Sequence, residues 1–300
     1  IGFFDPRQGT ETCGFVEQLA SDEIMLQISG DPYWAENCED VAFNSYPAAL
    51  MPDYKALRYI TSPNHVVSDS KNHHPGIDNS GPFLSMNPFS SRCCQHNHGF
   101  GWPYYTENLI YATPDNGIAA VLYNACQAEV KVGNGTEVTI KEQTNYPFEE
   151  TIRFTLTTPE KVSFPLYLRI PSWCKDASIA VNGQKLGVDL ISGKYAKIIR
   201  EWSDADEIVL TVPMTFNYRQ WQVNKNSVSV DYGPLSLSLK IDEDYQQKDS
   251  RETAIGDSKW QEGADASAWP TYEIYPASPW NYALQLNSPI SVRRKEWPFD

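Results

Sequence analysis

Three cysteines and one glutamate are the residues of this sequence whose types and spacing could do chemistry. Glu11 and Cys13 form a Glu-x-Cys pair, and Cys93 and Cys94 stand next to each other much later in the chain. Thiolate sulfur and carboxylate oxygen are common zinc ligands, and four such donors complete a tetrahedral site. A disulfide between neighbouring cysteines needs strained geometry, so the pair is better suited to hold a metal or to remain as two thiols. These residues therefore form a candidate zinc site.

The same residues also admit a structural interpretation. Cys13 can line a helix core, Glu11 can cap the first turn of that helix, and Cys93 and Cys94 can be a buried pair of thiols. The six cysteines are scattered through a chain too large to need a disulfide framework. The remaining cysteines lie in apolar surroundings and are predicted to be buried, inert thiols: Cys38, Cys126 and Cys174.

A helix over residues 11–29 would carry the first two candidate ligands. Its apolar residues recur near the 3.6-residue period, and Gly30 provides the stop. Asp31 and Pro32 then suit the N-cap and first position of a second helix, which Pro47 would end. The pattern predicts a helical hairpin.

The vicinal cysteines follow a long irregular stretch, residues 51–92, that is rich in proline and histidine. Irregular stretches of this length inside a domain are usually functional or disordered. This one is too aromatic and apolar for disorder, so we predict loops around a site. A helical pattern resumes over residues 98–112, and a turn over residues 113–117 ends it.

From Gly117 onward the pattern becomes that of short β-strands. Seven runs separated by turns predict a β-sandwich, and residues 227–240 form a further strand-rich stretch. Residues 241–280 are polar and are predicted to be long loops. The fold class is therefore expected to be α+β and multidomain, with divisions at 1–113, 114–214 and 215–300.

Composition excludes several partners. The 300 residues include 24 Lys and Arg against 38 Asp and Glu, a net charge of −14. Nucleic acids and anionic membranes both require a basic surface, so neither is an expected partner. No apolar run approaches the length of a membrane span. Aromatic residues make up 13% of the chain, which fits either aromatic cores or surfaces that stack on sugars.

An ordered series of seven motifs runs along nearly the whole chain and includes the candidate ligands. The motifs are Glu11-Thr12-Cys13, Cys93-Cys94-x-x-Asn97, Thr144-Asn145-Tyr146-Pro147-Phe148, Leu168-Arg169-Ile170-Pro171-Ser172-Trp173-Cys174, Val181-Asn182-Gly183, Arg200-Glu201-Trp202 and Tyr232-Gly233-Pro234-Leu235. In this order they resemble glycoside hydrolase family 127, the β-L-arabinofuranosidase-like enzymes. The resemblance implies that residues 1–113 end an (α/α)6 catalytic barrel, that 114–214 form a β-sandwich, and that 215–300 belong to a second, incomplete β-rich domain.

The resemblance also implies a site. Glu11, Cys13, Cys93 and Cys94 would hold Zn²⁺, and Cys93 would be the nucleophile that attacks the anomeric carbon. His96 stands where the family usually has a different residue after the vicinal cysteines. It is expected to contact substrate or to hydrogen-bond to a ligand residue, although a zinc contact or a plain loop position is also open.

The implied function is a retaining glycoside hydrolase that releases β-linked L-arabinofuranose, or a related sugar, from plant-type glycans. The family's acid/base glutamate would lie before Ile1, so this chain alone is expected to be inactive. The alternative is a non-catalytic carbohydrate-binding or structural protein with a structural zinc site. A carbohydrate is the expected partner, the oligomeric state is left open, and a periplasmic or extracellular location is the working expectation.

Overall fold

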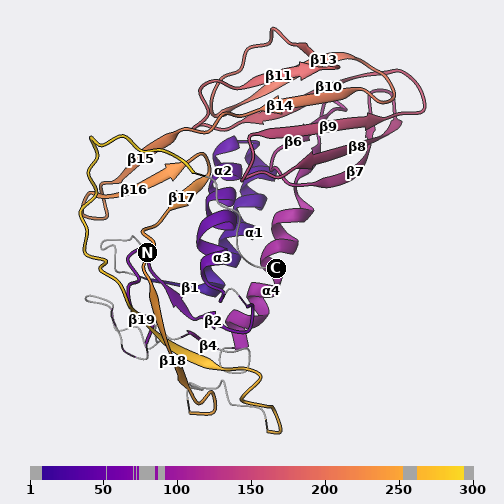
Figure 1. Ribbon diagram of the computed structural model, residues 1–300. Helices are drawn as coiled ribbons and strands as arrows, with labels where there is room; N and C mark the ends of the chain where they lie inside the picture. Colours follow the sequence, from indigo (N-terminus) through magenta and orange to yellow (C-terminus); the bar gives the residue numbers. More distant parts are fainter. Residues whose placement is uncertain are drawn as a thin grey trace.

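The computed structural model describes residues 9–51, 53–69, 71, 73, 85–86, 92–252 and 262–293 (Figure 1). The described residues form a few helices and many strands arranged in sheets, so the fold is α+β. Much of the predicted loop region between residues 51 and 92 lies outside the described residues. Within the described part of the chain, no helix combines the length and apolarity that a membrane span requires.

The predicted helical hairpin is confirmed. Helix α1 (Thr12–Ser29) ends at Gly30, whose φ of 64° is the left-handed conformation that glycine adopts without strain. Helix α2 (Pro32–Asp40) begins with the Asp31 carboxylate accepting a hydrogen bond from the Tyr33 N–H at 3.0 Å. A π-helical turn, η1 (Val41–Ser45), and a short helix, α3 (Tyr46–Ala48), continue it. The helix therefore runs past Pro47, which lies in the first turn of α3, where a missing N–H costs nothing.

The second predicted helix is shifted relative to the structure. Helix α4 spans Arg92–Glu107, so it starts before the vicinal cysteines rather than after them. Its C-terminal end is also earlier than predicted, because residues Ile110–Ala112 form strand β5. Helix α4 packs along α1 and shares a core with it, and Tyr105 and Leu109 are buried in this core. Helix α4 thus includes residues 92–97, which the sequence pattern left outside the helix, and it packs on α1.

Two sheets follow the helices and share one hydrophobic core. The four-stranded sheet has the order β13-β10-β6-β5, and the six-stranded sheet has the order β12-β11-β14-β9-β8-β7. The additional strands are β6 (Ile118–Ala120), β7 (Cys126–Val132), β8 (Thr136–Thr144), β9 (Thr151–Thr157), β10 (Val162–Ile170), β11 (Ser178–Val181), β12 (Gln184–Lys185), β13 (Lys194–Trp202) and β14 (Glu207–Thr211). Inward-facing residues alternate along these strands: Ile152, Phe154 and Leu156 on β9 are all fully buried.

The C-terminal strands return to the helical part of the chain. Strands β15 (Phe216–Trp221), β16 (Ser227–Tyr232) and β17 (Leu235–Leu237) form one sheet beside α2 and α3 (Figure 1). Strands β18 (Glu243–Lys248) and β19 (Thr271–Pro276) join β4 (Ser85–Met86) and β2 (Leu57–Arg58) in another. The prediction of long loops over residues 241–280 is therefore wrong for the two segments that form β18 and β19. Strand β18 is almost wholly exposed, which leaves no apolar alternation in its sequence to detect.

Helix α2 connects the helical part of the chain to the four-stranded sheet that contains β10 and to the sheet of β15–β17. Glu39 on α2 is buried and pairs with Arg169 of β10, which is itself fully buried. The second carboxylate oxygen of Glu39 accepts a hydrogen bond from the Tyr146 hydroxyl at 2.8 Å. The next residue of α2, Asp40, pairs with Arg219 of β15 at 2.7 Å. The acidic residues of α2 thus attach it to two different sheets.

Candidate metal centre

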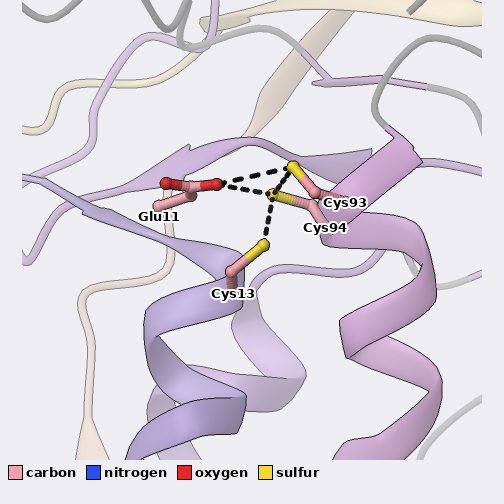
Figure 2. A group of neighbouring side chains, drawn as sticks. All are labelled: Glu11, Cys13, Cys93 and Cys94. Atoms are coloured by element: carbon pink, nitrogen blue, oxygen red, sulfur yellow. Dashed lines mark hydrogen bonds between the residues drawn. The ribbon is translucent and has the colours of Figure 1, made fainter.

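The candidate ligands lie where two helices begin. Glu11 ends strand β1 (Thr10–Glu11) and is the N-cap residue of α1, Cys13 lies in the first turn of α1, and Cys93 and Cys94 lie in the first turn of α4. Figure 2 shows the four side chains converging between the two helix starts. All four predicted ligands are therefore brought together by the fold.

Backbone pairing holds the first of these helix starts in place. Strand β1 pairs with β3 (Ile60–Thr61), with Glu11 opposite Ile60. The Thr12 N–H donates to the Tyr59 carbonyl at 3.0 Å, and the Thr12 hydroxyl donates to the Arg58 carbonyl at 2.5 Å. The Glu11 side chain makes no capping hydrogen bond, so the structural interpretation of Glu11 as a helix cap is wrong. Its carboxylate is turned toward the sulfurs instead.

The distances fit a four-coordinate metal ion. The four donor atoms all lie within 4.8 Å of one another. The Cys94 sulfur is 3.4 Å from that of Cys13 and 4.0 Å from that of Cys93. One Glu11 carboxylate oxygen is 3.7 Å from the Cys93 sulfur and 3.5 Å from the Cys94 sulfur. Zinc–sulfur and zinc–oxygen bonds of about 2.3 Å and 2.0–2.2 Å give tetrahedral edges of about 3.8 Å between sulfurs and about 3.6 Å from sulfur to oxygen.

Electrostatics favour a cation at this point. The pKa of the Cys13 thiol is raised to about 11, chiefly by burial and also by the nearby Glu11, while hydrogen bonds from Asn97 and Cys94 oppose the shift. Without a cation Cys13 is thus a neutral thiol at pH 7, whereas a bound divalent ion stabilises thiolates. The amino ends of α1 and α4 also carry partial positive charge, which supports thiolate sulfur in their first turns.

The thiols of the centre differ in accessibility. Cys93 is exposed, Cys13 is half-buried and Cys94 is buried. A small molecule arriving from solvent therefore meets the Cys93 sulfur first. All six cysteines are free, and those outside the centre behave largely as predicted, since Cys38 and Cys174 are buried and Cys126 is half-buried.

Two residues beside the ligands were not assigned a role by sequence reasoning. The Tyr59 hydroxyl hydrogen-bonds to the Glu11 carboxylate, and burial, with Glu11 adding to it, raises the pKa of Tyr59 to about 12. The Asn97 side chain hydrogen-bonds to the Cys13 sulfur. Asn97 belongs to the Cys-Cys-x-x-Asn motif and could have been found there, but Tyr59 lies in no motif and reaches Glu11 through the pairing of β1 with β3.

His96 lies on α4, is exposed, and is not a member of the four-residue group. Its predicted contact with substrate stays a prediction. Within the described ranges, no other set of three or more Cys, His, Asp or Glu donors lies close enough to share an ion.

Three thiols and a carboxylate held by two helix starts, next to a strand-rich region, form a group that could bind a metal ion in a protein of the α+β class. Residues 3–107 match the family model of the β-L-arabinofuranosidase GH127 catalytic domain, and residues 117–214 match that of the GH127 middle domain. The chain belongs to glycoside hydrolase family 127.

Solved structures agree with this assignment at the level of the fold. A glycoside hydrolase aligns with a TM-score of 0.66 and 25% identity, over 77% of this chain and 38% of its own. A GH127 β-L-arabinofuranosidase from Geobacillus stearothermophilus T6 aligns with a TM-score of 0.63 and 20% identity, over 91% of this chain and 48% of its own. A GH127 β-arabinofuranosidase aligns with a TM-score of 0.62 and 17% identity, over 91% and 47%. The chain thus spans less than half the length of these proteins, and no curated protein matches it.

Proposed function

We propose that this chain carries the nucleophile and metal ligands of a retaining glycoside hydrolase, which releases β-linked L-arabinofuranose or a related sugar from plant-type glycans. The observation that carries the proposal is the convergence of Glu11, Cys13, Cys93 and Cys94 within 4.8 Å in a member of family 127. In the whole protein we propose that the helices belong to an (α/α)6 barrel and the two sheets to a β-sandwich.

Zinc, when bound by these four residues, would keep the thiols ionised near neutral pH and fix the direction of each sulfur. Cys93 is the exposed sulfur and would attack the anomeric carbon, forming a sulfur–carbon bond as the bond to the leaving oxygen breaks. The leaving oxygen takes a proton from a general acid. Water, deprotonated by the same group, then displaces the Cys93 sulfur, so the configuration at the anomeric carbon is retained.

The general acid/base is proposed to be a glutamate that precedes Ile1 in the whole protein, so that this chain by itself would not turn over substrate. Cys13, Cys94 and Glu11 would have the supporting role of holding the centre while Cys93 reacts. Tyr59 would orient the Glu11 carboxylate through its hydrogen bond.

The experiment compares the whole protein with two variants, Cys93→Ala and Cys126→Ala. Cys126 is a free, half-buried thiol outside the centre, so it controls for the loss of a cysteine as such. We expect one zinc per chain in the unaltered protein by elemental analysis. We expect Cys93→Ala to lower the release of arabinose from an aryl β-L-arabinofuranoside by roughly three or more orders of magnitude, and Cys126→Ala to leave it unchanged. Full activity of Cys93→Ala would refute the mechanism.

A structural zinc site is the second candidate, and one observation favours it. Four protein donors complete a tetrahedron, and closed four-ligand sites are typical of structural zinc, whereas catalytic sites usually keep one position open. If Cys93→Ala lowers the thermal stability of the zinc-loaded protein but leaves sugar release intact, the site is structural.

A further inference from the structure

A second concave site lies on the far side of α2 from the helix core, and we refer to it as the α2 pocket. It has a volume of about 210 Å³ and is enclosed by α2, the turn after β10, and strands β15 and β16. The residues that matter for its chemistry are Tyr33, Glu36, Asp40, Trp173, Arg219 and Asp231. None of its lining residues is a ligand of the metal centre. Figure 1 places α2 beside the β15–β17 sheet, whereas β1 lies toward the other end of the helices.

The carboxylates of the pocket are held in place by protein donors. Glu36 accepts hydrogen bonds from both the N–H and the hydroxyl of Ser172, each at 2.5 Å. Asp40 accepts from two Arg219 nitrogens, at 2.7 and 3.3 Å. Asp231 lies 3.0 Å from the Arg219 Nε and also accepts from the Ser236 hydroxyl at 2.8 Å. These carboxylates are therefore fixed acceptors rather than mobile surface charges.

This arrangement excludes two ligand classes. Glu36, Asp40 and Asp231 outnumber Arg219, so the pocket repels anions such as phosphates and sugar acids. The pocket also lacks a metal-binding group, because the carboxylate oxygens are divided among separate protein donors and do not converge on one point. An ionised carboxylate offers about four acceptor positions, so each still has room for a ligand hydroxyl.

The aromatic walls supply the complementary apolar surface. The Tyr33 side chain is 60% exposed and is held edge-on against Trp34, with ring centroids 5.0 Å apart. Trp173 is half-buried and packs on the core shared by the two sheets. Rigid aromatic faces beside fixed acceptors suit a ring that has an apolar C–H face and several hydroxyls. The volume is below the roughly 300–1,000 Å³ of pockets for drug-sized molecules, which suits a single ring.

We propose that the α2 pocket is a second carbohydrate-binding site, separate from the metal centre, that takes one neutral sugar unit. The ring would lie against Tyr33 and Trp173, while its hydroxyls donate to Glu36, Asp40 or Asp231. A site of this kind would hold a glycan chain on the protein surface while another part of the same glycan occupies the metal centre. The inference rests on the proposed function for this role and for the choice of probe.

The test uses the zinc-loaded full chain labelled with fluorotryptophan, titrated with methyl β-L-arabinofuranoside and followed by ¹⁹F NMR. The Trp173 resonance is assigned with Trp173→Phe. We expect this resonance to shift saturably, and the shift to persist in Cys93→Ala. The diagnostic variant is Tyr33→Ala, which removes an exposed aromatic wall of the pocket and is expected to bind the sugar about tenfold more weakly. Tyr282→Ala, which removes an exposed tyrosine outside the pocket, is the matched control.

The outcomes separate this inference from the proposed function. Absence of a saturable shift at Trp173, unchanged affinity in Tyr33→Ala, or equal binding of D-galacturonate would overturn the second site. Loss of the shift in Cys93→Ala would also overturn it, because binding would then depend on the metal centre. Persistence of the shift, together with full sugar release by the whole protein carrying Cys93→Ala, would leave the second site standing and count against the proposed glycosidase mechanism alone.

Discussion

The buried pair between Glu39 and Arg169 allows a stability prediction whose size follows from the structure. The two side chains are 2% and 0% exposed. Besides Glu39, Arg169 has the Val121 carbonyl as an acceptor at 2.6 Å, and its guanidinium lies 5.1 Å from the Tyr123 ring centroid. Glu39→Gln keeps the shape of the side chain but removes the charge, which leaves a buried guanidinium without a counter-ion. Breaking a buried pair in this way costs about 3–5 kcal/mol in the free energy of unfolding.

Two comparison variants are expected to lose less free energy of unfolding than Glu39→Gln. Tyr146→Phe removes one hydrogen bond to the same carboxylate, which is expected to cost about 1.5–3 kcal/mol. Glu207→Gln breaks the pair with Arg153, whose atoms are just as close at 2.5 Å but whose side chains are 42% and 40% exposed. Exposed pairs contribute less than about 1 kcal/mol. The three pairs of atoms are similarly close. Burial separates Glu39→Gln and Tyr146→Phe from Glu207→Gln, and the loss of a charge separates Glu39→Gln from Tyr146→Phe.

The assay is urea denaturation of the zinc-loaded chain, followed by far-ultraviolet circular dichroism, with midpoints compared at a common m-value. The expected order of destabilisation is Glu39→Gln, then Tyr146→Phe, then Glu207→Gln. If Glu39→Gln costs no more than Glu207→Gln, then the buried pair does not carry the two charges and the reasoning fails.

Three further predictions follow from other parts of the molecule. Gly101→Ala would place a methyl group 2.4 Å from the Tyr46 ring and should lower stability by about 1–3 kcal/mol in a thermal melt. The control is Gly99→Ala in the same helix, where the added methyl group has nothing within 4 Å, and it should be neutral or stabilising in the same measurement. Burial, together with Glu107 and Asp22, raises the pKa of Glu23 to about 8 from an ordinary value of 4.5, so the folded chain binds the extra proton. Stability should therefore fall as pH rises from about 4.5 through 8, and Glu23→Gln should remove this slope in denaturation curves taken across that range. Chelation of bound zinc should lower the melting temperature of the unaltered chain. Cys94→Ala removes the buried ligand, so it should abolish zinc retention and the effect of the chelator on the melting temperature. An equal response to the chelator in both proteins would contradict the metal assignment.

The sequence predicts those elements whose signals are local. Gly30 and the Asp31-Pro32 step fix the hairpin of α1 and α2 because a left-handed C-cap, an N-cap carboxylate and an N1 proline each act within one turn. The sequence pattern places the start of the second helix too late, after the vicinal cysteines. Gly99, Gly101 and Pro103 weaken its helical pattern, and the helix persists because it packs on α1.

The strands at the C-terminus differ from prediction for a related reason. Strand β18 has polar residues throughout and gains its structure from pairing with β19, which in turn reaches β4 from a distant part of the chain. Non-local pairing of this kind leaves no period in the local sequence. The same applies to Tyr59, which reaches Glu11 only because β1 and β3 are paired.

The metal centre was predictable as a set of donors but not as a geometry. Spacing alone left open a helix cap for Glu11 and a buried pair for Cys93 and Cys94. Two features of the fold decide between the alternatives: the pairing of β1 with β3 turns the Glu11 carboxylate away from the helix end, and the early start of α4 puts adjacent cysteines on different sides of one turn. As a result Cys94 faces inward while Cys93 remains exposed. Because successive residues on a helix point about 100° apart, a vicinal pair can supply one buried ligand and one accessible sulfur to the same ion.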